Sequence, residues 1–155
     1  MKIRGCQSDD LGKLAKVYTD SYNHEDIEEL WTVESAEKLL SRFYELQPDL
    51  FFVAESDTAL VGGTVAVAKP WWNGNHITDG ELFVAPNAQG EGVGRKLLKK
   101  LFTEAKSKYG AVSWDTFTHT YRDHPLKWYK SLGFSEIDKW TMIHGNIDEV
   151  LDKMK

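Results

Sequence analysis

The sequence predicts an α+β domain in which helices flank a central, mostly antiparallel mixed sheet. Three observations support this fold class. Apolar residues recur at helical spacing in long segments, apolar runs of strand length lie between them, and a glycine-rich turn joins a strand to a helix in the second half of the chain. No repeat, linker or low-complexity segment divides the 155 residues. We therefore expect a single domain over residues 1–155.

The first part of the chain is expected to form one strand and two helices. The strand covers residues 2–6, and Ser8 or Asp9 can cap the helix that follows. The apolar face of this helix consists of Leu11, Leu14, Ala15, Tyr18 and Tyr22. A second helix is expected over residues 35–46. It ends before Pro48 because a proline disfavours helical backbone at the residue that precedes it.

The middle of the chain is expected to form three antiparallel strands. They cover residues 50–55, residues 60–69 and a segment that ends at Val84. Ser56 and Asp57 form the first turn, and Asn73-Gly74 is a strong signal for a hairpin between the second and third strands. Short turns of this kind join strands that run in opposite directions.

The second half of the chain alternates between helices and strands. A helix follows the glycine-rich turn and ends at Gly110, which suits the left-handed conformation of a helix C-terminus. The remaining elements are a strand over 111–117, a short helix over 124–132, a strand over 134–143 and a weak helix over 150–154. The main elements are thus expected in the order β-α-α-β-β-β-α-β-α-β.

The composition excludes several classes of protein. The single cysteine, Cys6, cannot form an internal disulfide, which favours a reducing, cytoplasmic compartment. No arrangement of cysteine and histidine has zinc-ligand spacing, so we expect no metal. The first ten residues lack an apolar leader, and glycines and Thr64 interrupt the longest apolar run, so we expect neither secretion nor a membrane partner. The excess of 24 acidic over 19 basic residues argues against nucleic-acid binding.

The glycine-rich turn carries the strongest functional signal. Its glycines fall at positions 90, 92 and 94, between a strand and a helix. The first N–H groups of a helix have no acceptor within it, so this turn can hold an anion. The glycine spacing differs from that of the dinucleotide fingerprint, and Arg95 stands where the P-loop motif needs a glycine.

The turn resembles the pyrophosphate loop Gln-x-x-Gly-x-Gly of the GCN5-related N-acetyltransferase (GNAT) superfamily, here Gln89-x-x-Gly92-x-Gly94. The preceding residues 82–86, Leu-x-Val-x-Pro, are typical of the family's fourth strand. Further along, Tyr129-x-x-x-Gly133-Phe134 is similar to the family's C-terminal motif, and the expected element order agrees with the family fold. The run from His124 to Phe134 is also similar to some aminoglycoside acetyltransferases. Arg122 and Pro125 replace an Asn and an Ala that are usual in the family.

The resemblance implies acetyl-CoA as the cofactor. Gly92 and Gly94 let the backbone approach a diphosphate closely, and Arg95 and Lys96 supply cations beside it. The pantetheine arm is expected along the strand near Phe83 and Val84. The implied cofactor-binding residues are Phe83, Val84, Gln89, Gly90, Gly92, Val93, Gly94, Arg95 and Lys96.

Acetyl transfer to an amine requires a base, because a protonated amine has no lone pair to attack with. Glu81 is our candidate base, with Asp79 as second choice on the same strand face. The Val84 N–H is the candidate donor to the developing oxyanion. The resemblance assigns Tyr129 to support of the departing thiolate. Both side chains also have a non-catalytic interpretation. Glu81 can be a solvated strand position. Tyr129 can be a core residue beside Leu126 and Leu132.

The acceptor is expected to be a cationic amine. Residues 20–37 contain seven acidic side chains and no Lys or Arg. This segment can therefore attract a polyamine, an aminosugar-like compound or a basic peptide. The candidate substrate-binding residues are Glu25, Asp26, Glu28, Glu29 and Trp31. Trp71 and Trp72 are expected either at an acceptor wall, in the core or at a dimer contact. A solvated acidic loop is the plain alternative.

Two other functions remain open at this point. A non-catalytic acyl-CoA sensor would keep the loop without the chemistry, and a nucleotide-binding module would use the same turn but fits its spacing poorly. A homodimer is a further expectation.

Overall fold

The computed structural model describes residues 1–24, 29–57, 59–121 and 123–155, which form two compact units, residues 1–116 and residues 117–155. The first unit contains β1 (Lys2–Gly5), α1 (Leu11–Asn23), α2 (Val33–Leu46), β2 (Phe51–Glu55), β3 (Leu60–Trp71), β4 (Gly74–Val84), α3 (Val93–Tyr109) and β5 (Ser113–Trp114). The second unit contains α4 (Leu126–Ser131) and α5 (Ile147–Lys153). The expectation of one domain stays a prediction.

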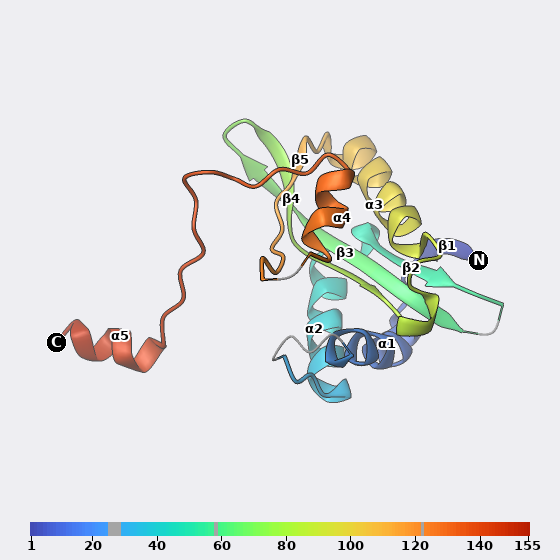
Figure 1. The fold of residues 1–155 in the computed structure, drawn as a ribbon, viewed down its shortest axis with the longest axis horizontal. Helices are drawn as coiled ribbons and strands as arrows, with labels where there is room; N and C mark the ends of the chain where they lie inside the picture. Colours follow the sequence, from blue (N-terminus) through green and yellow to red (C-terminus); the bar gives the residue numbers. More distant parts are fainter. Residues whose placement is uncertain (25–28, 58, 122) are drawn as a thin grey trace. The chain divides into compact units, whose positions relative to one another are not determined.

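The first unit is built on a five-stranded sheet with the order β1-β2-β3-β4-β5. Neighbouring strands are antiparallel except β4 and β5, which are parallel. Helices α1 and α2 cover one face of this sheet and α3 covers the other (Figure 1). The predicted α+β fold class, with its mostly antiparallel mixed sheet, is therefore confirmed.

The core follows from the alternation of side chains along the strands. Phe51 and Val53 of β2 point to α1 and α2 and belong to the largest apolar cluster. Phe52 points to the other face, where the Lys100 ammonium of α3 lies 5.6 Å from the centroid of its ring. Each face of the sheet thus has its own apolar layer.

A β-bulge interrupts β4. Val65 pairs with Glu81 and Val67 pairs with Thr78, so one residue on β3, Ala66, faces two on β4, Asp79 and Gly80. Asp79 takes up the extra length with a positive φ of 49°. Thr78, and not Asp79, therefore shares a face with Glu81, and the expectation that Asp79 and Glu81 lie on one face is wrong.

The neighbour of the bulge is Trp114, whose indole covers Gly80. A Cβ on Gly80 would lie 2.7 Å from Trp114 Nε1, so only glycine fits under the indole. The β4–β5 ladder is confined to His76 and Ile77, immediately before the bulge. The strand expected over 111–117 is reduced to Ser113–Trp114, whose pairing with β4 ends where the bulge begins.

The helix ends largely agree with the sequence signals. Thr32 and Ser35 cap each other's backbone, with Ser35 N–H donating to Thr32 Oγ1 at 3.1 Å, so α2 begins two residues earlier than expected. Gly110 ends α3 with a φ of 61°, as expected. The hairpin signalled by Asn73-Gly74 is present, but its two turn residues are Trp72 and Asn73, because Gly74 already pairs with Trp71.

The second unit contains the main error of the sequence prediction. Residues 134–143 form no strand, although all of them are described. Lys139 has a positive φ of 72°, which breaks an extended backbone, and no strand in the described chain pairs with this segment. An unpaired strand leaves its backbone groups unsatisfied and is unstable. The C-terminal helix is longer than expected, because Asn146 caps its first turn.

Cys6 is buried beside the ion-paired Arg4 and Asp10. Burial, with a smaller contribution from the Asp10 carboxylate, raises the pKa of its thiol to about 12.

Among the helices of the described residues, none is long and apolar enough to cross a membrane.

The packing of Phe83 yields a stability prediction. Its ring lies over Gly63, where a Cβ would be only 2.6 Å from Cζ of Phe83. Gly63→Ala should therefore lower the free energy of unfolding by about 1–3 kcal/mol, measured by urea denaturation. Gly5→Ala is the matched control, since a Cβ there meets nothing within 4 Å. Equal effects of the two substitutions would contradict this packing.

Candidate functional site

The candidate site is centred on Glu81, whose side chain is half-buried and points from β4 toward α1. The Tyr22 hydroxyl donates a hydrogen bond to its Oε2 at 2.8 Å, and the Tyr18 hydroxyl donates to the same oxygen at 3.2 Å. No described side chain donates to Oε1. Glu81 is thus not a solvated strand position but a carboxyl with one anchored and one unengaged oxygen.

The surroundings change the acidity of this carboxyl. Burial raises the pKa of Glu81 above its ordinary value, and the two hydroxyl donors only partly oppose that effect. The nearby Glu29 carboxylate adds to the increase. Burial also raises the pKa values of Tyr18 and Tyr22, so both phenols remain protonated donors. The result is a carboxylate that takes up a proton more readily than an exposed glutamate does.

An aromatic wall stands next to Glu81. The Trp31 ring meets the Tyr18 ring edge-on at 5.1 Å, and the Tyr18 and Tyr22 rings are 4.4 Å apart. Trp31 Nε1–H donates to Glu29 Oε2 at 2.8 Å. The structure therefore brings together Glu81, Glu29 and Trp31 of the expected site residues.

The other expected acceptor residues are not part of this group. Glu25, Asp26 and Glu28 lie outside the described residues. Trp71 and Trp72 lie at the β3–β4 turn, where the Trp71 ring contacts Lys69 and His76.

The glycine-rich turn has the backbone geometry of an anion site. Gly90 and Gly92 both have a φ of 79°, and a Cβ on either would project into open space. Gly92 is the N-cap of α3 and provides no side-chain cap, so the helix start is open to a ligand. Arg95 and Lys96 are exposed beside it, whereas the Val93 side chain is buried in the core.

The end of β4 presents backbone groups next to this turn. Ala85 N–H donates to Val61 O, and Thr64 Oγ1 donates to Glu81 O, which places both of these backbone groups on the β3 side. Because backbone groups alternate along a strand, those of Leu82 and Val84 point to the opposite edge. No strand of the described chain pairs with that edge beyond Ile77.

The structure shows which groups of two expected cofactor residues, Gln89 and Phe83, face the turn and the strand edge. The Gln89 amide donates to Val84 O at 3.2 Å and so connects the turn to the strand end. Phe83 has its ring in the core and its backbone groups on the β3 side, so Leu82 joins Val84 as a residue with backbone groups at the open edge. Sequence reasoning missed Leu82, although alternation along the strand would have indicated it.

Tyr129 belongs to the second unit, where it lies on α4. Its ring packs against those of Trp128 and Phe134 at 5.0 and 5.2 Å. Its carbonyl accepts hydrogen bonds from the N–H groups of Leu132 and Phe134, which end the helix. Pro125 precedes α4 as its N-cap, and Arg122 lies outside the described residues.

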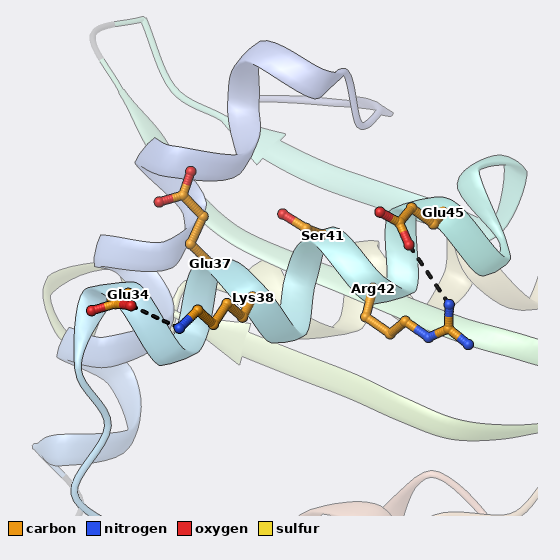
Figure 2. Close-up of a pocket in the computed structure, with 6 residues that line it drawn as sticks. All are labelled: Glu34, Glu37, Lys38, Ser41, Arg42 and Glu45. Carbon is orange, nitrogen blue, oxygen red and sulfur yellow. Dashed lines mark hydrogen bonds and ion pairs between the residues drawn. The ribbon is translucent and has the colours of Figure 1, made fainter.

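A surface depression lies elsewhere, on the exposed side of α2 (Figure 2). Its lining residues are Glu34, Glu37, Lys38, Ser41, Arg42 and Glu45. All come from one helix, and Lys38 and Arg42 pair with glutamates within it. It contains none of the expected site residues and is a solvated helix face.

Comparisons with known proteins bear on the family and the fold of the chain. A family model described as "Acetyltransferase (GNAT) domain" matches residues 47–136. A "possible acetyltransferase" from Clostridium difficile 630 is 17% identical with a TM-score of 0.77, over 94% of this chain and 97% of that one. A ribosomal-protein-alanine N-acetyltransferase from Brucella melitensis is 25% identical with a TM-score of 0.68, over 88% and 86%. Chaetomium thermophilum Naa20, solved with a bisubstrate analogue, is 26% identical with a TM-score of 0.64, over 85% and 70%. No curated protein matches the sequence.

The site predicts how Glu81 titrates. Its pKa, measured from the carboxyl ¹³C shift, should exceed 4.5, and Tyr22→Phe should raise it further because a hydrogen bond to the ionised form is lost. Tyr109→Phe is the control, since that hydroxyl donates to Asp49 instead. The folded state should also lose stability as the pH rises from 4.5 through the raised pKa, because ionised Glu81 is disfavoured there. An unchanged pKa in Tyr22→Phe would contradict the hydrogen-bond geometry.

Proposed function

The chain belongs to the GNAT acetyltransferase superfamily, and on that premise we propose that it moves the acetyl group of acetyl-CoA directly to a primary amine. The observation that carries the proposal is the half-buried Glu81, whose Oε2 is held by two phenols while Oε1 is left for a proton. A carboxyl in this setting suits a general base.

The open start of α3 and the open edge of β4 fit coenzyme A. The glycine-rich turn would hold the diphosphate through backbone N–H groups, with Arg95 and Lys96 adding positive charge. The backbone groups of Leu82 and Val84 would hydrogen-bond the pantetheine arm. As the second substrate, acetyl-CoA supplies an activated acetyl thioester.

Glu81 would accept the proton of the incoming amine, directly or through water. An alkyl ammonium has a pKa of about 10.4, so it must lose a proton before it attacks. The raised pKa of Glu81 brings its basicity closer to that of the amine than an exposed glutamate would. The Val84 N–H would donate to the carbonyl oxygen as negative charge develops there. Tyr129 is proposed to stabilise the departing thiolate.

The acceptor is proposed to be a cationic amine on a polyamine, an aminosugar-like compound or a basic peptide. Glu29 provides a carboxylate beside Glu81, and Trp31 provides a ring face that attracts a cation. The Brucella neighbour is named for acetylation of a protein alanine, which supports a peptide amine among the candidates.

The alternative of an acyl-CoA sensor is less well supported. A sensor needs the turn but has no use for a half-buried carboxyl with two hydroxyl donors.

We further propose that the enzyme acts in the cytoplasm, as the lone buried Cys6 suggests. The homodimer stays a prediction.

The function is tested by release of CoA thiol from acetyl-CoA with polyamines, aminosugars and basic peptides. Glu81→Gln should lower kcat by about 10²- to 10⁴-fold, while calorimetric affinity for acetyl-CoA is unchanged. Glu45→Gln, on the exposed side of α2, is the matched control. Binding of acetyl-CoA by the wild type without thiol release on any amine would establish the sensor instead.

The cofactor site is tested by adding a negative charge to the turn. Gly92→Glu should weaken CoA binding by at least about 100-fold, because the new carboxylate repels the diphosphate and a side chain at a φ of 79° is strained. Glu91→Gln is the control of opposite sign, since it removes a negative charge there and should strengthen binding slightly. Normal affinity in Gly92→Glu, by calorimetry, would refute the assignment of the turn.

A further inference from the structure

Asn23, the last residue of α1, holds the backbone of Trp31 at two points. Its Nδ2–H donates to the Trp31 carbonyl at 2.9 Å, and its Oδ1 accepts from the Trp31 N–H at 3.0 Å. One carboxamide thus satisfies both backbone groups of a residue eight positions further along the chain. Such a paired contact fixes the position and the direction of the segment that it holds.

Trp31, the residue held by Asn23, contributes its ring to the aromatic wall that it forms with Tyr18 and Tyr22. Trp31 meets the Tyr18 ring at an interplanar angle of 85° and donates to Glu29 through Nε1. Tyr18 in turn donates to Glu81. The backbone clamp therefore acts on the same indole that links Glu29 to the tyrosines around Glu81.

We propose that Asn23 is a positioning residue for the acceptor amine. By fixing the Trp31 backbone it holds the indole against Tyr18 and keeps the Glu29 carboxylate close to Glu81, so that a cationic amine finds both groups in place. This inference rests on the proposed function and assigns Asn23 to acceptor binding, not to the chemical step. Its signature is an increase in the acceptor KM at constant kcat.

The loss of positioning is measured with Asn23→Ala. The acceptor KM should rise by about tenfold, while kcat and the acetyl-CoA KM stay unchanged, because neither Glu81 nor the glycine-rich turn is altered. Asn146→Ala is the matched control: it removes two hydrogen bonds of 3.0 and 3.3 Å at the start of α5 and should leave the acceptor KM unchanged.

A double-mutant cycle separates positioning from a general loss of stability. Trp31→Ala should raise the acceptor KM, and adding Asn23→Ala to it should have little further effect, because no indole remains to be positioned. Additive effects of the two substitutions would overturn the proposal. An unchanged acceptor KM in Asn23→Ala would do the same.

A second readout does not depend on activity. In protein labelled with 5-fluorotryptophan, Asn23→Ala should shift or broaden the ¹⁹F resonance of Trp31, which Trp31→Phe identifies. An unaffected resonance contradicts the clamp. A wild type that acetylates no amine, with the resonance change present, contradicts the proposed function and the acceptor role while leaving the clamp itself demonstrated.

Discussion

The site depends on one extra residue in β4. Ile77 and Phe83 are six positions apart and would share a face in an uninterrupted strand. The bulge at Asp79 instead leaves Glu81 and Phe83 on the side of α1. Phe83 belongs to the apolar cluster there, and Ile77 does not. It also ends the β4–β5 ladder at Ile77, so the same irregularity that directs Glu81 inward leaves the far edge of β4 open. A bulge is a common device for redirecting a side chain beside a functional site.

Packing then connects the two sides of this arrangement. The Phe83 ring fills the space above Gly63 and meets Tyr18 at 5.1 Å, and Tyr18 meets Trp31. Phe83 belongs to the strand whose backbone faces the proposed cofactor, whereas Trp31 belongs to the wall that faces the proposed acceptor. Two aromatic contacts therefore tie the proposed positions of the two substrates to a single core, which favours a preorganised site.

The features that the sequence predicts well are local ones. The turn at Gly90 and Gly92, the end of α3 at Gly110 and the hairpin that leads into β4 at Gly74 each depend on backbone conformations that few residues adopt, so the residue type itself signals them. The glycine-rich turn was identifiable as a candidate anion site for that reason. Glu81 was also identifiable as a candidate from its place before the strand end.

The features that the sequence does not reveal depend on distant partners. Tyr22 and Glu81 are 59 positions apart, and nothing near either residue indicates that they meet. The extra residue at Asp79 appears only when β3 and β4 are aligned, which is why strand alternation placed Asp79 wrongly. Residues 134–143 have a plausible strand pattern, but a strand also needs a partner along its length.

The burial of Cys6 has a practical consequence. It is the chain's only cysteine, and its thiol is both enclosed and, with a pKa of about 12, almost entirely protonated at neutral pH. Thiolates, not thiols, react with disulfide reagents. A colorimetric reagent added to the folded protein would therefore register free coenzyme A with little background from the polypeptide, and a rising background would itself report unfolding.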